Sequence, residues 1–474
     1  MGTETILLGL ALVFGFYMAW NIGANDVANA MGTSVGSGAL TLKRAVILAA
    51  ILEFAGAFLV GSHVSETVRK GIVNPELFTS DPRVFVYGML AALLAAAVWL
   101  QIASYYGWPV STTHSIVGSI IGFGVVYAGM EAINWGKVGQ IVSSWVVSPL
   151  LSGTIAFLIF TLLRRKIFYA VHPVQAAKKI TPILVFFVFS ILTLVLVFKG
   201  LKNLNLDLSL PNALGVAMLV GVITAVLSHF LVQKIQVDDM PERIQEKQPG
   251  HVITAMEKAV MQLQKVSAAA TGDFKYQVKR VLDTVDNLSK TVKKGREVEL
   301  GSAEYNAVER IFVYLQILSA AFVAFAHGAN DVANAIGPLS AVITVLKRGI
   351  VELKTTVPLW VLAMGGVGIT IGLATWGWRV IETVGKKITE LTPSRGFAAE
   401  FAAATTIVLA SKLSLPISTT HTLVGAVLGV GLARGIGALN LNIVRDIVVS
   451  WVVTIPAGAL MAVLFFYILR AIFG

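Results

Sequence analysis

The sequence contains no cysteine, which excludes a disulfide framework, a thiolate nucleophile and a cysteine-based metal site. Charge is also scarce, because Asp, Glu, Lys and Arg make up 13% of the 474 residues, against about 25% in ordinary soluble domains. In their place, 56% of the residues are hydrophobic and the mean hydropathy is +0.78. This composition indicates an integral membrane protein.

Long apolar runs indicate that the membrane part is helical. A bilayer core about 30 Å thick is crossed by roughly 20 helical residues, and uncharged or nearly uncharged runs of about that length occur at 84–106, 110–130, 138–163, 180–198 and 208–233. The strands of a membrane barrel would alternate polar and apolar residues instead. We therefore predict an all-α polytopic membrane protein with about twelve transmembrane segments.

The net charge of +11 reflects membrane topology. Lys and Arg lie mostly in short loops between apolar runs, a distribution that predicts orientation in the bilayer and no nucleic-acid partner. The loop 164–180 has five basic residues and no acidic residue, so we expect it to be cytoplasmic. Two apolar runs later, the polar segment 234–307 is expected on the same side. Its apolar residues recur at helical spacing, which predicts one or two amphipathic helices that act as a connector or bind a partner. The expected location is the plasma (inner) membrane.

Two motifs occur twice. The octapeptide GANDVANA fills residues 23–30 and 328–335, and Pro-x-Ser-Thr-Thr-His fills 109–114 and 416–421. Their order and spacing are nearly constant, which is the signature of an internal duplication. We predict a first transmembrane repeat at 1–163, two inserted transmembrane segments at 164–233, a polar helical segment at 234–307 and a second repeat at 308–474.

The octapeptides place a carboxylate inside the membrane. Asp26 is the only charged residue between positions 5 and 42, and Asp331 is the only one between 311 and 346. Each run is too long for one crossing and short for two, which predicts a broken or re-entrant helix near the motif. A buried Asp costs about 2.5 to 3.5 kcal/mol on insertion scales, so it should face protein or water.

The side chains beside each aspartate suit a hard cation. In a helix, the Asp and the two Asn residues of each motif project from one side. Carboxylate, amide and backbone oxygens are ligands for a hard cation rather than for zinc. The sequence thus predicts two sodium sites, although the asparagines could instead bond helices together. The candidate sodium ligands are Asn25, Asp26, Asn29, Asn330, Asp331 and Asn334.

The hydroxyl triplets are typical of helix starts. Ser and Thr cap helix N-termini, whose free N–H groups and positive dipole end bind anions. Two such ends could surround a tetrahedral oxyanion, whereas a single one would be ordinary capping. The predicted phosphate-binding residues are Ser111, Thr112, Thr113, Ser418, Thr419 and Thr420, together with Asn25 and Asn330.

Four further polar residues lie in apolar surroundings. Glu53 and Glu400 are intramembrane ionisable groups and thus candidates for transport or coupling, with a protonated core glutamate as the alternative. His114 and His421 follow the triplets and are predicted to orient or gate, or to be structural. A Ser–His catalytic pair is disfavoured because no third residue recurs at a triad-like position. His327 has no counterpart, since Ile22 precedes the first octapeptide.

The doubled GANDVANA and Pro-x-Ser-Thr-Thr-His motifs, with Gly-Trp-Pro-Val at 107–110 and Leu-Glu-Phe-Ala-Gly at 52–56, closely resemble the inorganic phosphate transporter family. The resemblance covers everything except 164–306. It implies inverted repeats, phosphate uptake coupled to sodium or protons, and a homodimer. It also implies ion and phosphate binding at the motif residues and transport importance for the two glutamates.

The chemistry of the motifs agrees with the resemblance. Neither motif contains Lys or Arg, so the negative charge of phosphate must be offset by helix ends and bound cations. The favoured function is therefore sodium-coupled phosphate symport by alternating access, with sodium as a co-transported ion and no cofactor. The alternatives are proton-coupled symport of phosphate or metal–phosphate, a related sulfate carrier, a membrane phosphoesterase and a channel.

Overall fold

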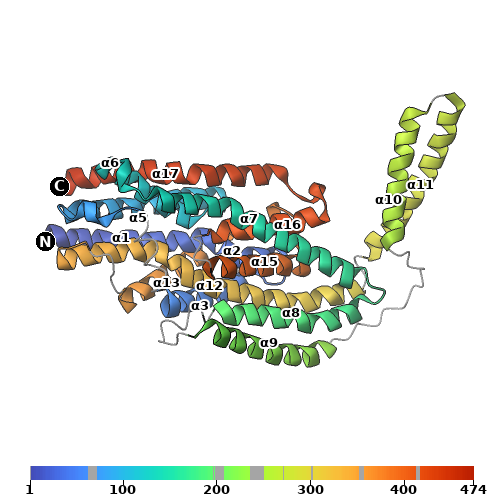
Figure 1. Cartoon of the computed structure of the whole chain (residues 1–474), viewed down its shortest axis with the longest axis horizontal. Helices are drawn as coiled ribbons and strands as arrows, with labels where there is room; N and C mark the ends of the chain where they lie inside the picture. Colours follow the sequence, from blue (N-terminus) through green and yellow to red (C-terminus); the bar gives the residue numbers. More distant parts are fainter. Residues whose placement is uncertain are drawn as a thin grey trace. The chain divides into compact units, whose positions relative to one another are not determined.

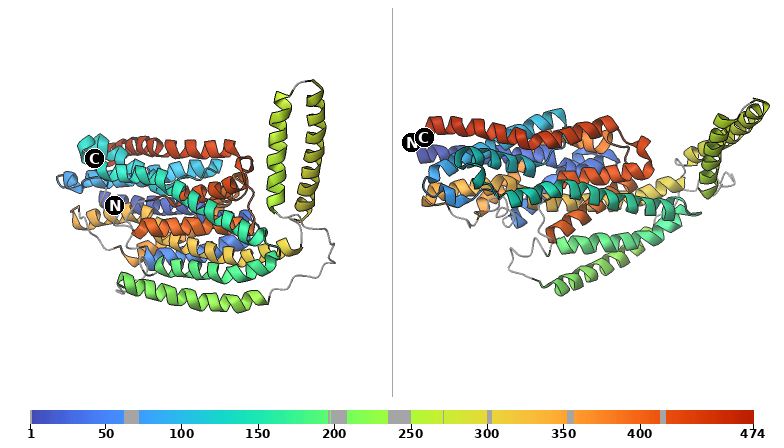
Figure 2. Two further views of the ribbon diagram at one scale, coloured as in Figure 1. Left: turned by 45° about the vertical axis from the view of Figure 1, so that its right-hand side comes forward. Right: turned by 45° about the horizontal axis from the view of Figure 1, so that its top comes forward.

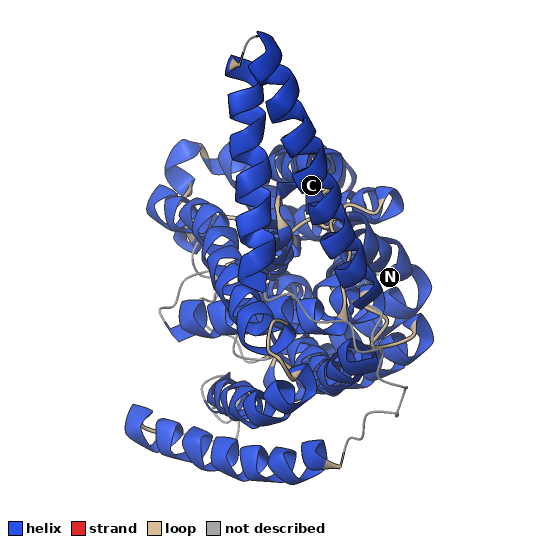
Figure 3. Cartoon of the chain, turned by 90° about the vertical axis from the view of Figure 1, so that its right-hand side faces the viewer, coloured by secondary structure: helices blue, strands red, loops and turns tan. Residues whose placement is uncertain are grey.

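The computed structural model describes residues 2–61, 72–195, 197, 208–234, 250–270, 272–299, 303–351, 357–412 and 417–474. Within these ranges the only β-structure is an isolated bridge between Val73 and Ile133, and helices form all other long elements (Figure 3). The all-α prediction is therefore confirmed. The main helices are α1 (Thr3–Asp26), α2 (Ala28–Gly36), α3 (Leu42–Val60), α5 (Pro82–Tyr106), α6 (Thr112–Ala128), α7 (Trp135–Leu163), α8 (Pro173–Val195), α9 (Leu210–Gln233), α10 (Gly250–Ala269), α11 (Gly272–Glu299), α12 (Ala303–Arg348), α13 (Leu359–Trp376), α14 (Trp378–Glu382), α15 (Pro393–Lys412), α16 (Thr419–Arg434) and α17 (Leu441–Phe473).

Eight of the described helical segments are long and apolar enough to cross a membrane, and the apolar helix α6 is shorter. This number comes from length and composition alone, so the prediction of about twelve segments stays a prediction. Many side chains on these helices, such as Leu158 and Leu231, are large, apolar and exposed. Such surfaces are typical of helices that face lipid.

The chain forms two compact units. The first contains Met1–Thr161, Val185–Thr224 and Phe312–Gly474, and the second contains Leu162–Leu184 and Ala225–Ile311. In the second unit, α10 and α11 pack as an antiparallel helical hairpin (Figure 2), which agrees with the amphipathic helices expected in the polar segment. Every predicted site residue lies in the first unit.

The two octapeptides differ in how the helix passes through them. In the first copy, the helix is interrupted at Val27, between α1 and α2. Val27 keeps right-handed helical angles, φ −61° and ψ −24°, so the interruption shifts the hydrogen bonding without turning the chain. In the second copy, α12 continues through Asp331 without a break. The predicted break is therefore present in one copy only. The identical octapeptides contain no proline and no glycine with positive φ, so the motif itself forces a turn in neither copy.

Two helical hairpins carry the hydroxyl triplets. Between α5 and α6 the chain turns at Gly107, whose φ of 69° suits glycine. The second triplet comes between α15 and α16, and residues 413–416 before it lie outside the described residues. The helices α6 and α16 are short, and each packs closely against a long helix. A Cβ on Gly118 would lie 2.7 Å from the Ile455 carbonyl oxygen in α17, and one on Gly425 would lie 2.4 Å from the Pro149 Cα in α7.

Candidate functional site

Asp26 lies where both halves of the chain meet. It is 1% exposed, and one carboxylate oxygen accepts a 2.6 Å hydrogen bond from Thr112 of the same half. The other oxygen accepts from Thr420 of the opposite half at 2.9 Å and from Asn29 at 3.2 Å. The structure thus places the first acidic motif beside both hydroxyl triplets.

Asp331 has a related but different environment. Its carboxylate accepts hydrogen bonds from Asn330 at 2.8 Å and from Thr419 at 3.2 Å. The bond from Thr419 matches the one between Thr112 and Asp26, because the two threonines occupy the same place in their motifs. Each aspartate therefore bonds with the start of the short helix from its own half.

The second asparagine of each octapeptide reaches the opposite half. Asn29 donates to Thr420 at 2.8 Å, and Asn334 donates to Thr112 at 3.1 Å and to Thr113 at 3.3 Å. These bonds cross between the duplicated parts in both directions. Each octapeptide is therefore hydrogen-bonded directly to the triplet of the other half.

Asn25, which was predicted as a ligand together with the other asparagines of the motifs, contacts the turn between α5 and α6. Its side-chain nitrogen donates at 3.0 Å to the Ser104 hydroxyl and at 3.0 Å to the Trp108 carbonyl oxygen. Its side-chain oxygen accepts from the Val110 backbone N–H at 3.1 Å. Asn25 thus holds the turn between α5 and α6, and its roles at sodium and phosphate stay predictions.

The serines of the two triplets are helix caps. The Ser111 hydroxyl accepts from the His114 backbone N–H at 3.3 Å, and the Ser418 hydroxyl accepts from that of His421 at 3.2 Å. This capping fixes the N-termini of α6 and α16 beside the aspartates. Because each serine faces the histidine's backbone and not its ring, the geometry of a Ser–His catalytic pair is absent at these two motifs.

His114 and His421 meet each other. Their ring centroids are 4.5 Å apart, and each ring lies on a tryptophan, Trp145 at 3.8 Å and Trp451 at 3.7 Å. Both imidazoles are buried. They join the starts of the two short helices, which agrees with an orienting role and does not distinguish it from a structural one.

His327 is the functional candidate that the sequence reasoning left without a role. Its Nε2 lies 2.7 Å from Asp331 and 4.0 Å from Asp26, and its Nδ1 lies 3.2 Å from Glu53. All four side chains are almost completely buried. The available signals were the four-residue spacing to Asp331, which puts both on one helix face, and the replacement of Ile22 by an imidazole in the second copy.

Glu400 lies in a separate polar cluster. It accepts hydrogen bonds from Thr33, from Ser34 at 2.9 Å, from Gln316 at 3.3 Å and from Ser319. These donors come from both halves of the chain. The two intramembrane glutamates thus belong to different clusters, and only Glu53 contacts the group around Asp331.

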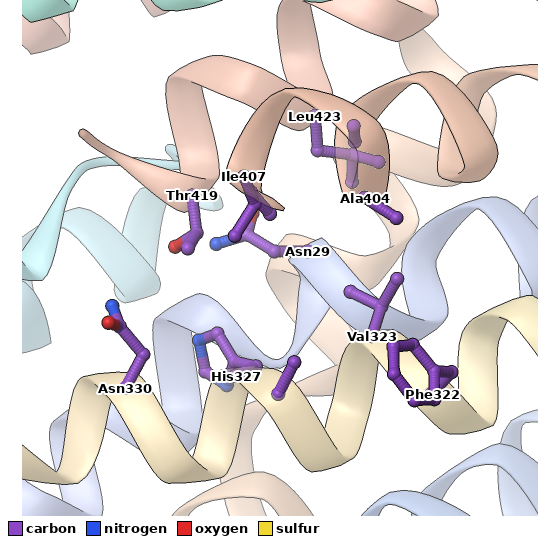
Figure 4. A pocket seen from close by; sticks show the side chains of 11 residues that line it. Asn29, Phe322, Val323, His327, Asn330, Ala404, Ile407, Thr419 and Leu423 are labelled. Atoms are coloured by element: carbon purple, nitrogen blue, oxygen red, sulfur yellow. The ribbon is translucent and has the colours of Figure 1, made fainter. Parts of the chain in front are cut away.

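A narrow cavity reaches the site from one side. It is lined by residues of α2, α12, α15 and α16 (Figure 4). Its polar lining consists of Asn29, His327, Asn330 and Thr419, and the remainder is apolar. These four side chains present amide, hydroxyl and imidazole groups to the cavity.

The charges of the site determine what it can bind. Asp26, His327 and Asp331 each offer an atom within 4.8 Å of the others, close enough to hold a cation. Among the buried polar side chains of the described residues, none is Lys or Arg. An anion bound here must therefore be neutralised by helix N-termini, by bound cations and by His327 when it is protonated.

Comparisons with known proteins agree with this chemistry. The model of the phosphate transporter family matches residues 22–462. Over 477 residues, the chain is 48% identical to the inorganic phosphate transporter 2-1, chloroplastic, of Arabidopsis thaliana, with 100% of this chain and 74% of the plant protein covered. A solved structure described as the sodium-dependent phosphate transporter matches with a TM-score of 0.78 and 38% identity, covering 98% of this chain and 100% of that chain.

Proposed function

The chain belongs to the phosphate transporter family, and we propose that it uses a sodium gradient to drive the import of inorganic phosphate. It is a secondary active membrane transporter and not an enzyme. The observation that carries the proposal is the convergence of two buried aspartates and two capped helix starts in one hydrogen-bonded cluster. The matching solved structure is that of a sodium-dependent phosphate transporter, which supports sodium as the coupling ion.

Sodium is proposed to bind at the two aspartates. Around Asp26, the Thr112 and Thr420 hydroxyl oxygens supply hard ligands of the kind that suit this ion, while the Asn29 amide nitrogen donates to the carboxylate. The Asn29 oxygen is buried without a protein partner, which leaves it available to a cation. Around Asp331, the corresponding hydroxyl is that of Thr419, and Asn334 is proposed as a ligand because it matches Asn29 in the repeated motif.

Phosphate is proposed to bind between the starts of α6 and α16. Backbone N–H groups and the threonine hydroxyls there would surround its oxygens, and Asn330 lies at the edge of the adjoining cavity. Sodium at the aspartates would lower the repulsion between carboxylate and phosphate. Binding of each ion would therefore strengthen binding of the other, since such coupling is reciprocal.

Alternating access would follow if the two halves are inverted repeats. Figure 1 shows α1 and residues 312–348 of α12 running in opposite directions, which supports an inverted relation. Rocking of one part against another would then open the site to each side in turn. The four sequence segments 1–163, 164–233, 234–307 and 308–474, a homodimer, a plasma-membrane location and cytoplasmic loops at 164–180 and 234–307 belong to the same proposal.

Uptake of labelled phosphate into proteoliposomes tests the proposal. A sodium gradient and a pH gradient should be imposed separately, and uptake should follow the sodium gradient. Asp26→Asn and Asp331→Asn should each abolish accumulation, while the exposed control Asp446→Asn should retain it. Uptake that follows only the pH gradient would favour proton-coupled transport of phosphate or metal–phosphate. Stronger competition by sulfate than by unlabelled phosphate would indicate a sulfate carrier.

A further inference from the structure

Arg379 contacts the end of the hairpin that carries the first hydroxyl triplet. It belongs to α14, and its Nη1 donates a hydrogen bond to the Tyr105 backbone carbonyl oxygen at 3.1 Å. Helix α5 ends at Tyr106, so this carbonyl is one of the last four of the helix, which have no N–H partner within it. Arg379 thus caps the C-terminus of α5 from a helix that is far away in the sequence.

Three aromatic rings hold the guanidinium group at this place. Its Cζ lies 5.0 Å from the ring centroid of Tyr105, 4.9 Å from that of Trp376 and 5.2 Å from that of Trp378. All three distances are within the range of a cation–π interaction. The buried Nε has no hydrogen-bond acceptor among the described residues, so the faces of the rings take the place of one.

The backbone of α14 also packs on the turn that follows α5. A Cβ on Gly107 would lie 3.3 Å from the Arg379 carbonyl oxygen and 3.0 Å from the Thr383 Oγ1. Gly107 begins the turn 107–111, which leads directly to Thr112 and its 2.6 Å hydrogen bond with Asp26. Arg379 therefore acts on the chain only a few residues before the first triplet.

The charge of Arg379 matters because of the helix that it caps. A helix C-terminus carries a partial negative charge of about half an elementary unit, and an N-terminus carries the opposite charge. The hairpin places the negative end of α5 beside the positive start of α6, where phosphate is proposed to bind. The last turn of α5 contains no basic residue. Without a cation from elsewhere, the end of α5 would repel an anion at the start of α6.

The sequence of the second hairpin supplies such a cation by itself. Residues 90–114 align without a gap to residues 397–421 through the shared Pro-x-Ser-Thr-Thr-His motif. This alignment pairs Tyr105 with Lys412, the last residue of α15. The second half therefore has a basic residue at the matching place in its own helix, whereas the first half receives its positive charge from α14.

We propose that Arg379 is a positioning residue of the phosphate site, which offsets the negative end of α5 and holds the turn that presents the first triplet. It acts on the anion through the helix end and does not touch it. This inference rests on the proposed binding of phosphate between α6 and α16, and it adds a cationic side chain that strengthens that binding. A merely structural role would instead change stability and leave the affinity of the folded protein for phosphate unchanged.

Two substitutions of Arg379 separate its charge from its size. Binding of labelled phosphate to the purified full chain is measured at saturating sodium, and the KM and maximal rate of uptake are measured in proteoliposomes. Arg379→Gln, which removes the charge, should raise both the Kd and the KM about threefold to thirtyfold, as expected for a charge at a partly buried helix end. The maximal rate should change less. Arg379→Lys keeps the charge without the planar fork, so it should recover most of the lost affinity.

Arg445 supplies a matched control for the loss of one arginine. Its side chain is 73% exposed and lies 3.3 Å from Asp446, so Arg445→Gln should leave the Kd and the KM unchanged. Melting temperatures show which variants are folded under the conditions of the binding assay. The proposal is overturned if folded Arg379→Gln binds phosphate as tightly as Arg445→Gln, or if Arg379→Lys binds as weakly as Arg379→Gln.

Trp378→Leu provides a second test that leaves the arginine in place. It removes one of the three rings that hold the guanidinium, so it should raise the Kd about twofold to fivefold, as expected for one cation–π interaction. If Arg379→Gln does not fold, this variant decides the matter, and an unchanged Kd overturns the proposal.

The same measurements distinguish this proposal from the proposed function. If the natural chain binds phosphate and the Arg379 variants bind it equally well, only the role of Arg379 is wrong. If the variants weaken binding but uptake does not follow the sodium gradient, the role of Arg379 is supported and only the coupling ion is wrong. If Thr112→Ala also leaves phosphate binding unchanged, the proposed site at the helix starts is wrong and the role of Arg379 is overturned with it.

Discussion

Gly23, the first residue of the first octapeptide, should be intolerant of even one added carbon. A Cβ at this position would lie 1.9 Å from the carbonyl oxygen of Ile369 in α13, and real Cβ contacts essentially never fall below 3.0 Å. The helices would have to separate locally by at least 1.1 Å, the difference between these distances. Because the opposing atom belongs to the backbone, no side-chain rotation relieves the clash. Overpacking of this kind costs about 1 to 3 kcal/mol.

Gly9 provides a matched control on the same helix. A Cβ there meets no atom within 4 Å, so Gly9→Ala should stabilise α1 by about 0.5 to 1 kcal/mol through helix propensity. The two variants should therefore differ in free energy of unfolding by about 1.5 to 4 kcal/mol. Gly23→Ala should also lower phosphate uptake, since Asp26 follows on the same helix.

Denaturant titration of the purified protein in detergent, followed by tryptophan fluorescence, measures this difference. Gly328→Ala supplies a second test, because its Cβ would lie 2.2 Å from the Glu53 carbonyl oxygen. If Gly23→Ala proved as stable as Gly9→Ala, the close approach of α1 and α13 would not constrain this position, and the packing argument would fail.

Three further outcomes are expected. Ser418→Ala removes the cap of α16, so it should destabilise that helix start by about 1 kcal/mol and raise the KM for phosphate more than it lowers the maximal uptake rate. In Glu400→Gln, an amide replaces the carboxylate that accepts hydrogen bonds from Ser34 and Ser319. Both the melting temperature and the uptake rate should therefore fall. Glu390 lies outside the membrane spans. Partial burial raises the pKa of its carboxyl, but the neighbouring charges of Arg395 and Arg434 lower it by more, so the pKa is held below its usual value. This stabilisation is present above the unfolded pKa of about 4.3 and is lost as pH falls through the lower folded pKa. Since the side chain is 75% exposed, Glu390→Gln should cost under about 1 kcal/mol near neutral pH and nothing at low pH.

The duplication made much of the site predictable from sequence. The threonines and the second asparagine of each octapeptide could be grouped because they recur in both halves, and the structure places them in one hydrogen-bonded cluster. The fold class followed from the length of the apolar runs. The separate location of Glu400 could not be predicted in this way, because its partners Ser34 and Ser319 come from helices whose packing the sequence does not encode locally.

The octapeptide helices show a second limit of sequence reasoning. Run length alone suggested that both motifs interrupt a helix, yet α12 passes through Asp331 without a break. A run longer than one crossing can be broken, tilted or extended beyond the bilayer. Only the neighbouring helices decide among these, so identical octapeptides can differ in backbone structure.

The two halves also differ in the residues beside their identical octapeptides. Gly23 packs against Ile369 just as Gly328 packs against Glu53, so Ile22 and Ile369 occupy in one half the places that His327 and Glu53 occupy in the other. In one half this place holds two isoleucines, and in the other it holds an imidazole and a carboxylate that lie 3.2 Å apart. The imidazole also lies 2.7 Å from Asp331 but 4.0 Å from Asp26. The two aspartates therefore differ in local charge although their motifs are identical. Because a cation responds to every charge within a few ångströms, we expect the two proposed sodium positions to differ in affinity.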